Sequence, residues 1–164
     1  MIRLFLNIKC QFKTLSFLIF VWVVLSLFVL IEIYSNGLNS KKITGYLIAF
    51  TITCGPSLLL YINYIYHSIF KEVTINLTNG IIYTKNKKEL NKFYIHDIDS
   101  ITKISSFPLA ENRMQWMPTD AFFYYVIKIK TGDLIKITSL MSDDKLSIKE
   151  FKIIENKKLI AFIL

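Results

Sequence analysis

Few residues of this chain are suited to catalysis or metal binding: 164 residues include two histidines and two cysteines. His96 and Asp97 are neighbours in the sequence, and on a strand their side chains would point apart, so the sequence does not imply a paired base and orienting carboxylate. Cys10 and Cys54 are expected at different depths of an apolar region, which favours neither a disulfide nor a metal site. The sequence contains no glycine-rich phosphate loop and no nucleophile elbow. We therefore predict a protein that is not an enzyme, with no catalytic residues, no cofactor and no metal.

Asn63 and His67 lie four residues apart in the apolar region, so they share one face if that region is helical. His67 is close to the end of the region, where a side chain reaches the headgroups of a bilayer. We interpret the two residues as interfacial anchors, and a role in proton transfer or ligand binding is the alternative.

A basic cluster and an irregular segment are the candidate contact sites. Contact with anionic lipid headgroups is predicted for Lys85, Lys87, Lys88 and Lys92, and a solvated hairpin tip is the alternative. Proximity to a membrane accounts for the net charge of +8, so we predict no nucleic-acid partner.

The segment from Phe107 to Thr119 is the one long irregular stretch, and such loops in small domains are often functional. Contact with a partner protein or the membrane is predicted for Arg113, Met114, Trp116 and Met117, because arginine, tryptophan and methionine are frequent at interfaces. In the alternative, the loop folds back and Trp116 and Met117 fill the mouth of a barrel.

The sequence also contains two long apolar runs, Leu15–Ile33 and Ile43–Ile69. Each is long enough to cross a bilayer, and we predict transmembrane spans at about 15–34 and 44–69. The first run is too long for a signal peptide and lacks a small-residue cleavage pattern, so we expect it to be retained. The short connection makes the spans an antiparallel hairpin, and Gly55-Pro56 predicts a kink in the second.

The hairpin divides the chain into a basic N-terminal segment with two spans, residues 1–70, and a soluble domain, residues 71–164. Arg3, Lys9, Lys13 and Lys71 flank the spans on the side of the termini. Their number favours a multi-pass protein with both termini in the cytoplasm, although Lys41 and Lys42 lie in the intervening loop.

The soluble domain is predicted to be mostly strands. Val73, Ile75 and Leu77 alternate with polar residues before Asn79-Gly80, the strongest signal for a two-residue hairpin turn. We expect strands at 72–78, 81–85, 89–95, 101–105, 122–130 and 134–138, with a tight bend around residues 95–101.

Two finer predictions concern the end of the chain. A three-residue loop, Thr131–Asp133, is expected to place Ile129 opposite Ile135 and Ile127 opposite Ile137. Ser147 and Glu150 form a capping box, which predicts a C-terminal helix that continues to Lys157 and Lys158.

The chain resembles bacterial membrane-anchored PH-like domain proteins. The resemblance rests on two spans, short hairpin strands, the Ile95–Ile101 bend, the Ile129–Ile135 turn and a closing helix. The resemblance implies an α+β fold: a transmembrane hairpin and a small PH-like split β-barrel closed by a C-terminal helix. It also implies a location at the bacterial plasma (inner) membrane and no enzymatic activity. Phosphoinositide-binding PH domains use a basic loop between their first two strands, whereas Asn79-Gly80 carries no lysine.

Two functional hypotheses follow. The first is a non-enzymatic membrane-anchored interaction or scaffolding module that presents the PH-like domain at the inner membrane face. The second is an immunity or regulatory subunit of another membrane protein that acts through its transmembrane helices. Both imply the lipid bilayer and an unidentified protein as partners.

Overall fold

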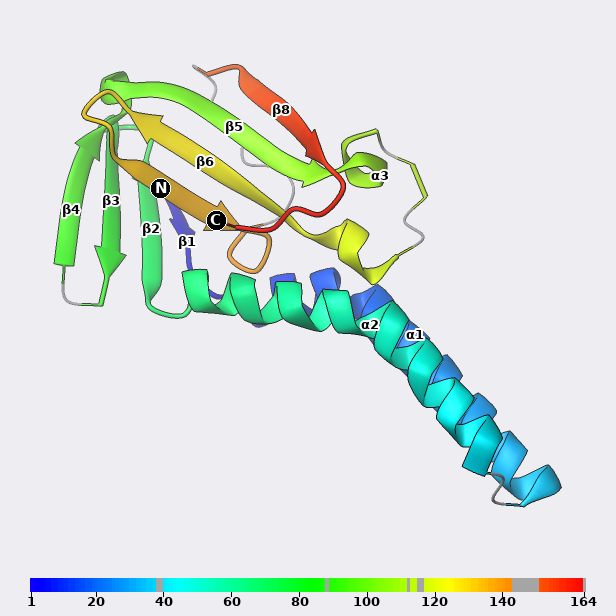
Figure 1. Ribbon diagram of the computed structural model, residues 1–164. Helices are drawn as coiled ribbons and strands as arrows, with labels where there is room; N and C mark the ends of the chain where they lie inside the picture. Colours follow the sequence, from blue (N-terminus) through cyan, green and yellow to red (C-terminus); the bar gives the residue numbers. More distant parts are fainter. Residues whose placement is uncertain (38–39, 88, 112, 115–116, 143–150, 164) are drawn as a thin grey trace.

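A body of two β-sheets carries a long helical hairpin that projects from one side, and both ends of the chain lie in this β body (Figure 1). The computed structural model describes residues 1–37, 40–87, 89–111, 113–114, 117–142 and 151–163.

Within the described residues, each sheet has four strands. The first is antiparallel, in the order β1 (Ile2–Leu4), β2 (Lys71–Asn76), β3 (Ile81–Asn86) and β4 (Glu89–Tyr94). The second has the order β7 (Leu134–Thr138), β6 (Phe123–Ile129), β5 (Ile98–Ser106) and β8 (Ile153–Lys158). The predicted α+β class is confirmed, but the sheets do not close into a barrel in the described part of the chain.

The helical hairpin is inserted between two paired strands of the first sheet. Helices α1 (Ile8–Asn36) and α2 (Ser40–Ser68) follow β1 and precede β2, and Arg3 lies opposite Thr74 in the β1–β2 ladder. The sheet therefore contains residues from both sides of the predicted division at residue 70. Both ends of the hairpin are fixed to the same sheet.

The alternation predicted for the first strand after the hairpin is confirmed at Val73 and Ile75, which are fully buried. Leu77 lies beyond β2 and is 43% exposed. The reason is the turn: Asn76 pairs with Ile81, so four residues rather than two connect β2 to β3. Gly80 completes the turn at φ +62°, a conformation that glycine adopts without steric cost.

The register predicted for the β6–β7 hairpin is wrong by two residues, since Ile127 lies opposite Ile135. The turn closes earlier because the Gly132 amide donates to the Ile129 carbonyl and the Ile129 amide donates to the Asp133 carbonyl. A shift of two residues keeps every side chain on its face of the sheet, so the predicted core residues remain buried.

The connections include three short helices. The predicted bend is confirmed as a single 3-10 turn, η1 (Ile95–Asp97). The long irregular segment begins with α3 (Phe107–Ala110) and ends with η2 (Pro118–Ala121), which packs against both α1 and α2.

The predicted C-terminal helix is wrong for residues 151–158, because β8 occupies residues 153–158 and pairs in parallel with β5. Ile153 packs against the core, and Glu155 lies 3.9 Å from the buried ammonium group of Lys103. This pairing overrides the local helix signal. The predicted cap, Ser147 to Glu150, falls outside the described residues.

The contrast between Ile75 and Leu77 gives a test of the sheet. Ile75→Ala removes a fully buried side chain and is expected to lower the free energy of unfolding by about 2–5 kcal/mol. Leu77→Ala, the matched control at an exposed position, is expected to lower it by less than about 1 kcal/mol. Chemical denaturation of the full chain in detergent measures both, and equal losses would contradict the four-residue turn.

Candidate functional site

The helical hairpin has two parts with different surroundings. Its junction half, residues 8–17 of α1 and 56–68 of α2, lies along the β body, and its distal arm, residues 18–36 and 40–55, turns away from it (Figure 1). Pro56 lies inside α2, where it has no amide hydrogen to donate to the preceding turn. The predicted kink in this helix agrees with the change of direction in the hairpin.

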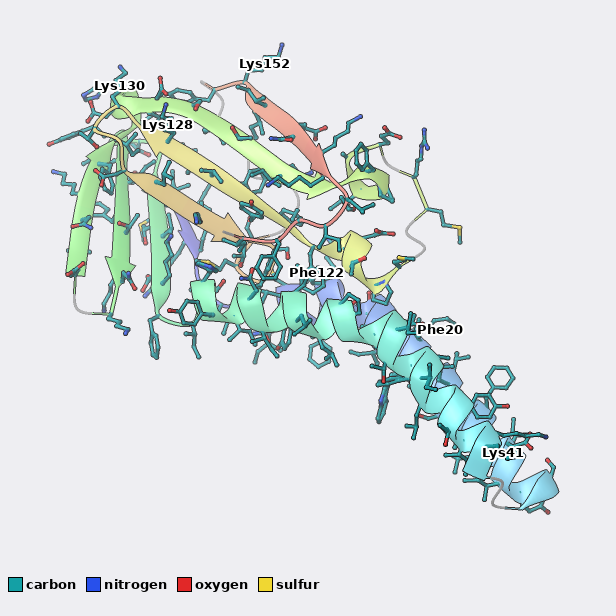
Figure 2. All side chains as sticks on the ribbon, viewed as in Figure 1. Phe20, Lys41, Phe122, Lys128, Lys130 and Lys152 are labelled. Atoms are coloured by element: carbon teal, nitrogen blue, oxygen red, sulfur yellow. The ribbon has the colours of Figure 1, made fainter. Side chains whose placement is uncertain are left out.

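One face of the junction half docks on the second sheet. Its buried residues recur every three or four positions, at Ser57, Leu60, Tyr64 and Ser68. The Tyr64 ring meets the Phe122 ring edge to face, with centroids 5.1 Å apart, and Figure 2 shows Phe122 between the sheet and the helix. The hydroxyl groups of Ser68 and Thr138 lie 2.7 Å apart.

The C-terminal segment is held by the same part of α2. The Asn63 side chain donates to the Ile163 carbonyl and accepts from the Ile163 amide, both at 3.2 Å. The Tyr64 hydroxyl donates to the Ala161 carbonyl at 2.6 Å. Asn63, which we interpreted as an interfacial anchor, therefore binds backbone of the β body, while the His67 ring packs edge to face on the ring of Tyr66.

The opposite face of the junction half is apolar and exposed. We call it the junction face and define it by Ile8, Phe12, Leu59, Ile62 and Tyr66, each more than 60% exposed. Residues two apart on a helix are separated by about 200°, so Ile62 points away from the sheet that buries Leu60 and Tyr64. Large apolar side chains on both faces indicate two apolar surroundings, of which the β body provides one.

The distal arm exposes apolar side chains on most of its surface, including Phe20, Trp22, Phe28, Leu30, Leu47, Ile48 and Ile52. Both helices, over Leu18–Ser35 and Lys41–Ser68, are long and apolar enough to cross a membrane. Lys42 binds Glu32 at 2.7 Å near the far end of the arm, where Figure 2 also shows Lys41.

Two clefts adjoin the end of α2. One, of about 320 Å³, is lined by Tyr66, His67, Ile69, Phe70, Lys71, Asn86 and Lys87. The other, of about 350 Å³, is lined by Phe5, Leu6, Ile69, Phe70, Lys71, Glu72 and Lys85. Lys71 belongs to both, and the Lys87 ammonium group lies 5.5 Å from the centre of the Phe70 ring.

The charges around these clefts are mostly positive. Burial, together with the smaller effect of the nearby charge of Lys136, lowers the pKa of Lys71 from 10.5 to about 8. Glu72, which lines the second cleft, is bound by the guanidinium group of Arg3. The site is therefore a partly buried cationic surface suited to an anion.

The predicted lysine cluster is only partly brought together. Lys85 and Lys87 line the clefts, whereas Lys92 lies over the ring of Tyr94 on β4, 5.0 Å from its centre. Lys88 falls outside the described residues. Sequence reasoning did not select Lys71 as a site residue, although its place as the first basic residue after the second apolar run was a usable signal.

The predicted contact loop is exposed where it is described. Met114 is 72% and Met117 is 64% exposed, so Met117 does not fill a barrel mouth as the alternative interpretation required. Arg113 forms an ion pair with Glu111 at 2.7 Å. The Asp120 carboxylate accepts the Met117 amide at 3.0 Å, which fixes one end of the loop. Trp116 lies outside the described residues.

The remaining candidates for chemistry are separate from one another. Cys10 and Cys54 are both buried thiols. His96 and Asp97 do not point apart as they would on a strand, because the predicted bend here is a 3-10 turn; the His96 Nε2 atom lies 3.3 Å from an Asp97 carboxylate oxygen. The His96 side chain is 75% exposed. In the described part of the chain, no three histidine, cysteine, aspartate or glutamate residues could hold a metal ion.

Two four-stranded sheets with a helical insertion define an α+β module of the PH-like class. The model of the PH domain family matches residues 2–150, and the chain belongs to this family. The match includes the hairpin and ends before β8. No curated protein and no solved structure matches the chain. PH domains are typically non-catalytic modules that mediate interactions with lipids or proteins.

The lowered pKa of Lys71 predicts a pH dependence of stability. Between about pH 8 and 10.5 the unfolded chain holds a proton at Lys71 that the folded protein has lost, so stability contributed by this group rises with pH. Below about pH 8 the lysine is charged in both states and its full burial cost remains.

Lys71→Met is therefore expected to raise the free energy of unfolding at pH 7 and to reduce its increase between pH 8 and 10. Denaturation of the full chain in neutral detergent at several pH values measures this, with the exposed Lys152→Met as control. A variant whose pH profile matches that of the wild type would contradict the assignment.

Proposed function

We propose that this protein is a non-catalytic interaction module that its helical hairpin anchors in the bacterial plasma membrane, with the β body and both termini on the cytoplasmic side. The observation that carries the proposal is the insertion of an apolar, exposed helical arm between two paired strands. Because β1 and β2 pair, the hairpin must leave the β body and return to it on the same side.

The distal arm supports the membrane part of the proposal. Each exposed leucine, isoleucine or phenylalanine that enters lipid contributes on the order of 1.5–3 kcal/mol. The basic residues Arg3, Lys9, Lys13 and Lys71 lie at the junction, and Lys41 and Lys42 lie at the far end. This bias favours the cytoplasm for the junction side.

The loop between α3 and η2 supports the interaction part of the proposal. η2 packs against both helices of the hairpin and so holds the loop beside it. Arg113, Met114 and Met117 are exposed there, and arginine and methionine are enriched in protein interfaces. We propose this loop as the contact for a protein partner at the membrane.

A charge in the distal arm tests the anchor. The wild-type protein is expected to stay in the membrane pellet after alkaline carbonate extraction. Ile48→Arg with Leu27→Arg is expected to lower the retained fraction, since each central arginine costs about 2.5–3.5 kcal/mol in a bilayer. Asn91→Arg, on the exposed β4 strand, is the control and is expected to remain in the pellet. Recovery of wild-type protein in a detergent-free high-speed supernatant would overturn the proposal.

The partner contact is tested by alanine substitution in the loop. Arg113→Ala, Met114→Ala and Met117→Ala together are expected to reduce the amount of co-purifying protein at least about tenfold, as loss of an interface hot spot does. Pro56→Ala is the comparison, because it alters the hairpin and leaves the loop intact. If the partner still co-purifies with the loop variant and no longer co-purifies with Pro56→Ala, the contact lies in the helices, as in the alternative hypothesis of a regulatory subunit.

A further inference from the structure

The junction face and the two cationic clefts are neighbouring parts of one surface. Tyr66 belongs to the junction face and lines the first cleft, and Ile69 and Phe70, which line both clefts, follow directly at the end of α2. We propose that the junction face lies in the headgroup–acyl boundary of the membrane that holds the distal arm, and that the cleft at Lys71 and Lys87 receives the phosphate of an anionic lipid. This inference rests on the proposed membrane anchor.

The two faces of each helix in the junction half have opposite surroundings. In α2, Leu60 and Tyr64 are buried against the sheet, and Ile62 and Tyr66 are 63% and 79% exposed on the far side. In α1, Cys10 is buried, and Ile8 and Phe12 are exposed in the same way. A helix pair with this pattern that lies beside a bilayer buries its apolar face about 5–10 Å into the interface.

The distal arm of α2 is short for a membrane span. The part of α2 from Ser40 to Gly55 is about 24 Å long at 1.5 Å per residue, whereas the hydrocarbon core is about 30 Å thick. The remainder of α2 is docked on the sheet and cannot extend the crossing. The α1 part of the arm, residues 18–36, is about 28 Å long and comes close to the full thickness. Immersion of the junction face supplies the depth that α2 lacks, so that both helices reach the far headgroups.

The clefts at the edge of the junction face are mostly positively charged. Lys71, Lys85 and Lys87 line the clefts, and the one acidic residue lining them in the described chain, Glu72, is bound by Arg3. His67 and the Asn86 side chain add hydrogen-bond donors to the first cleft. Lys71 is partly buried next to other positive charges, a cost that a phosphate in the cleft would offset. A phosphate held there lies at the edge of the junction face, where lipid headgroups are.

The depth of single labelled positions tests the junction face. The full chain is reconstituted in vesicles of phosphatidylcholine and phosphatidylglycerol, with a fluorophore at Ile62→Cys in the junction face, Ile48→Cys in the distal arm or Lys152→Cys. Figure 2 shows Lys152 on the side of the β body away from the hairpin. The wild-type protein, treated with the same fluorophore, gives the background labelling of its own two cysteines, which are buried.

We expect lipids that carry a shallow spin label to quench the fluorophore at residue 62 and aqueous iodide to quench it at residue 152. If iodide quenches the fluorophore at residue 62 as strongly as at residue 152 while residue 48 is quenched by the labelled lipid, the proposed immersion of the junction face is wrong. The proposed membrane anchor is not contradicted by that result. If residue 48 also responds to iodide and not to lipid, the anchor itself is wrong.

The phosphate site is tested by lipid preference. Spin-labelled phosphatidylglycerol is expected to associate with the reconstituted protein more strongly than spin-labelled phosphatidylcholine. Lys71→Gln and Lys87→Gln are each expected to reduce this ratio by up to about fivefold, the equivalent of about 1 kcal/mol per lysine near an anionic surface. Lys152→Gln is the charge-matched control and leaves the ratio unchanged. If both cleft variants keep the wild-type ratio of phosphatidylglycerol to phosphatidylcholine association, the proposal that the cleft binds a lipid phosphate is wrong.

Discussion

The docking of α2 on the second sheet determines how the rest of this protein is arranged. Tyr64 is fully buried there, with its ring against Phe122 and its hydroxyl bound to the backbone of the C-terminal segment. Asn63 adds two hydrogen bonds to the same segment. Because these contacts hold half of a long apolar helix on the β body, the hairpin is packed against the domain and not joined to it through a separate linker.

This constraint changes the meaning of the second apolar run. As a free helix, residues 44–69 would cross a bilayer, but docking removes its second half from that role. The hydrophobic residues of the junction half therefore divide into two sets, one that packs on the sheet and one that remains exposed on the far face. Such a double-faced helix favours a position between a protein surface and a membrane surface.

The β body illustrates which local signals survive folding. The strand alternation at Val73 and Ile75 and the bend at Ile95–Asp97 are local, and the structure has both. The helix expected from Ser147 onward is absent from residues 151–158, because the edge of β5 offers a full ladder of backbone hydrogen bonds and a place for Ile153 in the core. A capping signal contributes about 1 kcal/mol, which such tertiary contacts exceed.

Local patterns were enough to predict the apolar hairpin, the strand-rich remainder and the positive charge at their boundary, since hydrophobic periodicity and turn residues act over short distances. They did not reveal that Ile2–Leu4 pairs with β2, that Lys71 lines one cleft with Lys85 and another with Lys87, or that Asn63 binds Ile163. These contacts join residues far apart in the chain. Only the packing of the hairpin against the sheets decided them, because a contact between distant segments leaves no local pattern to read.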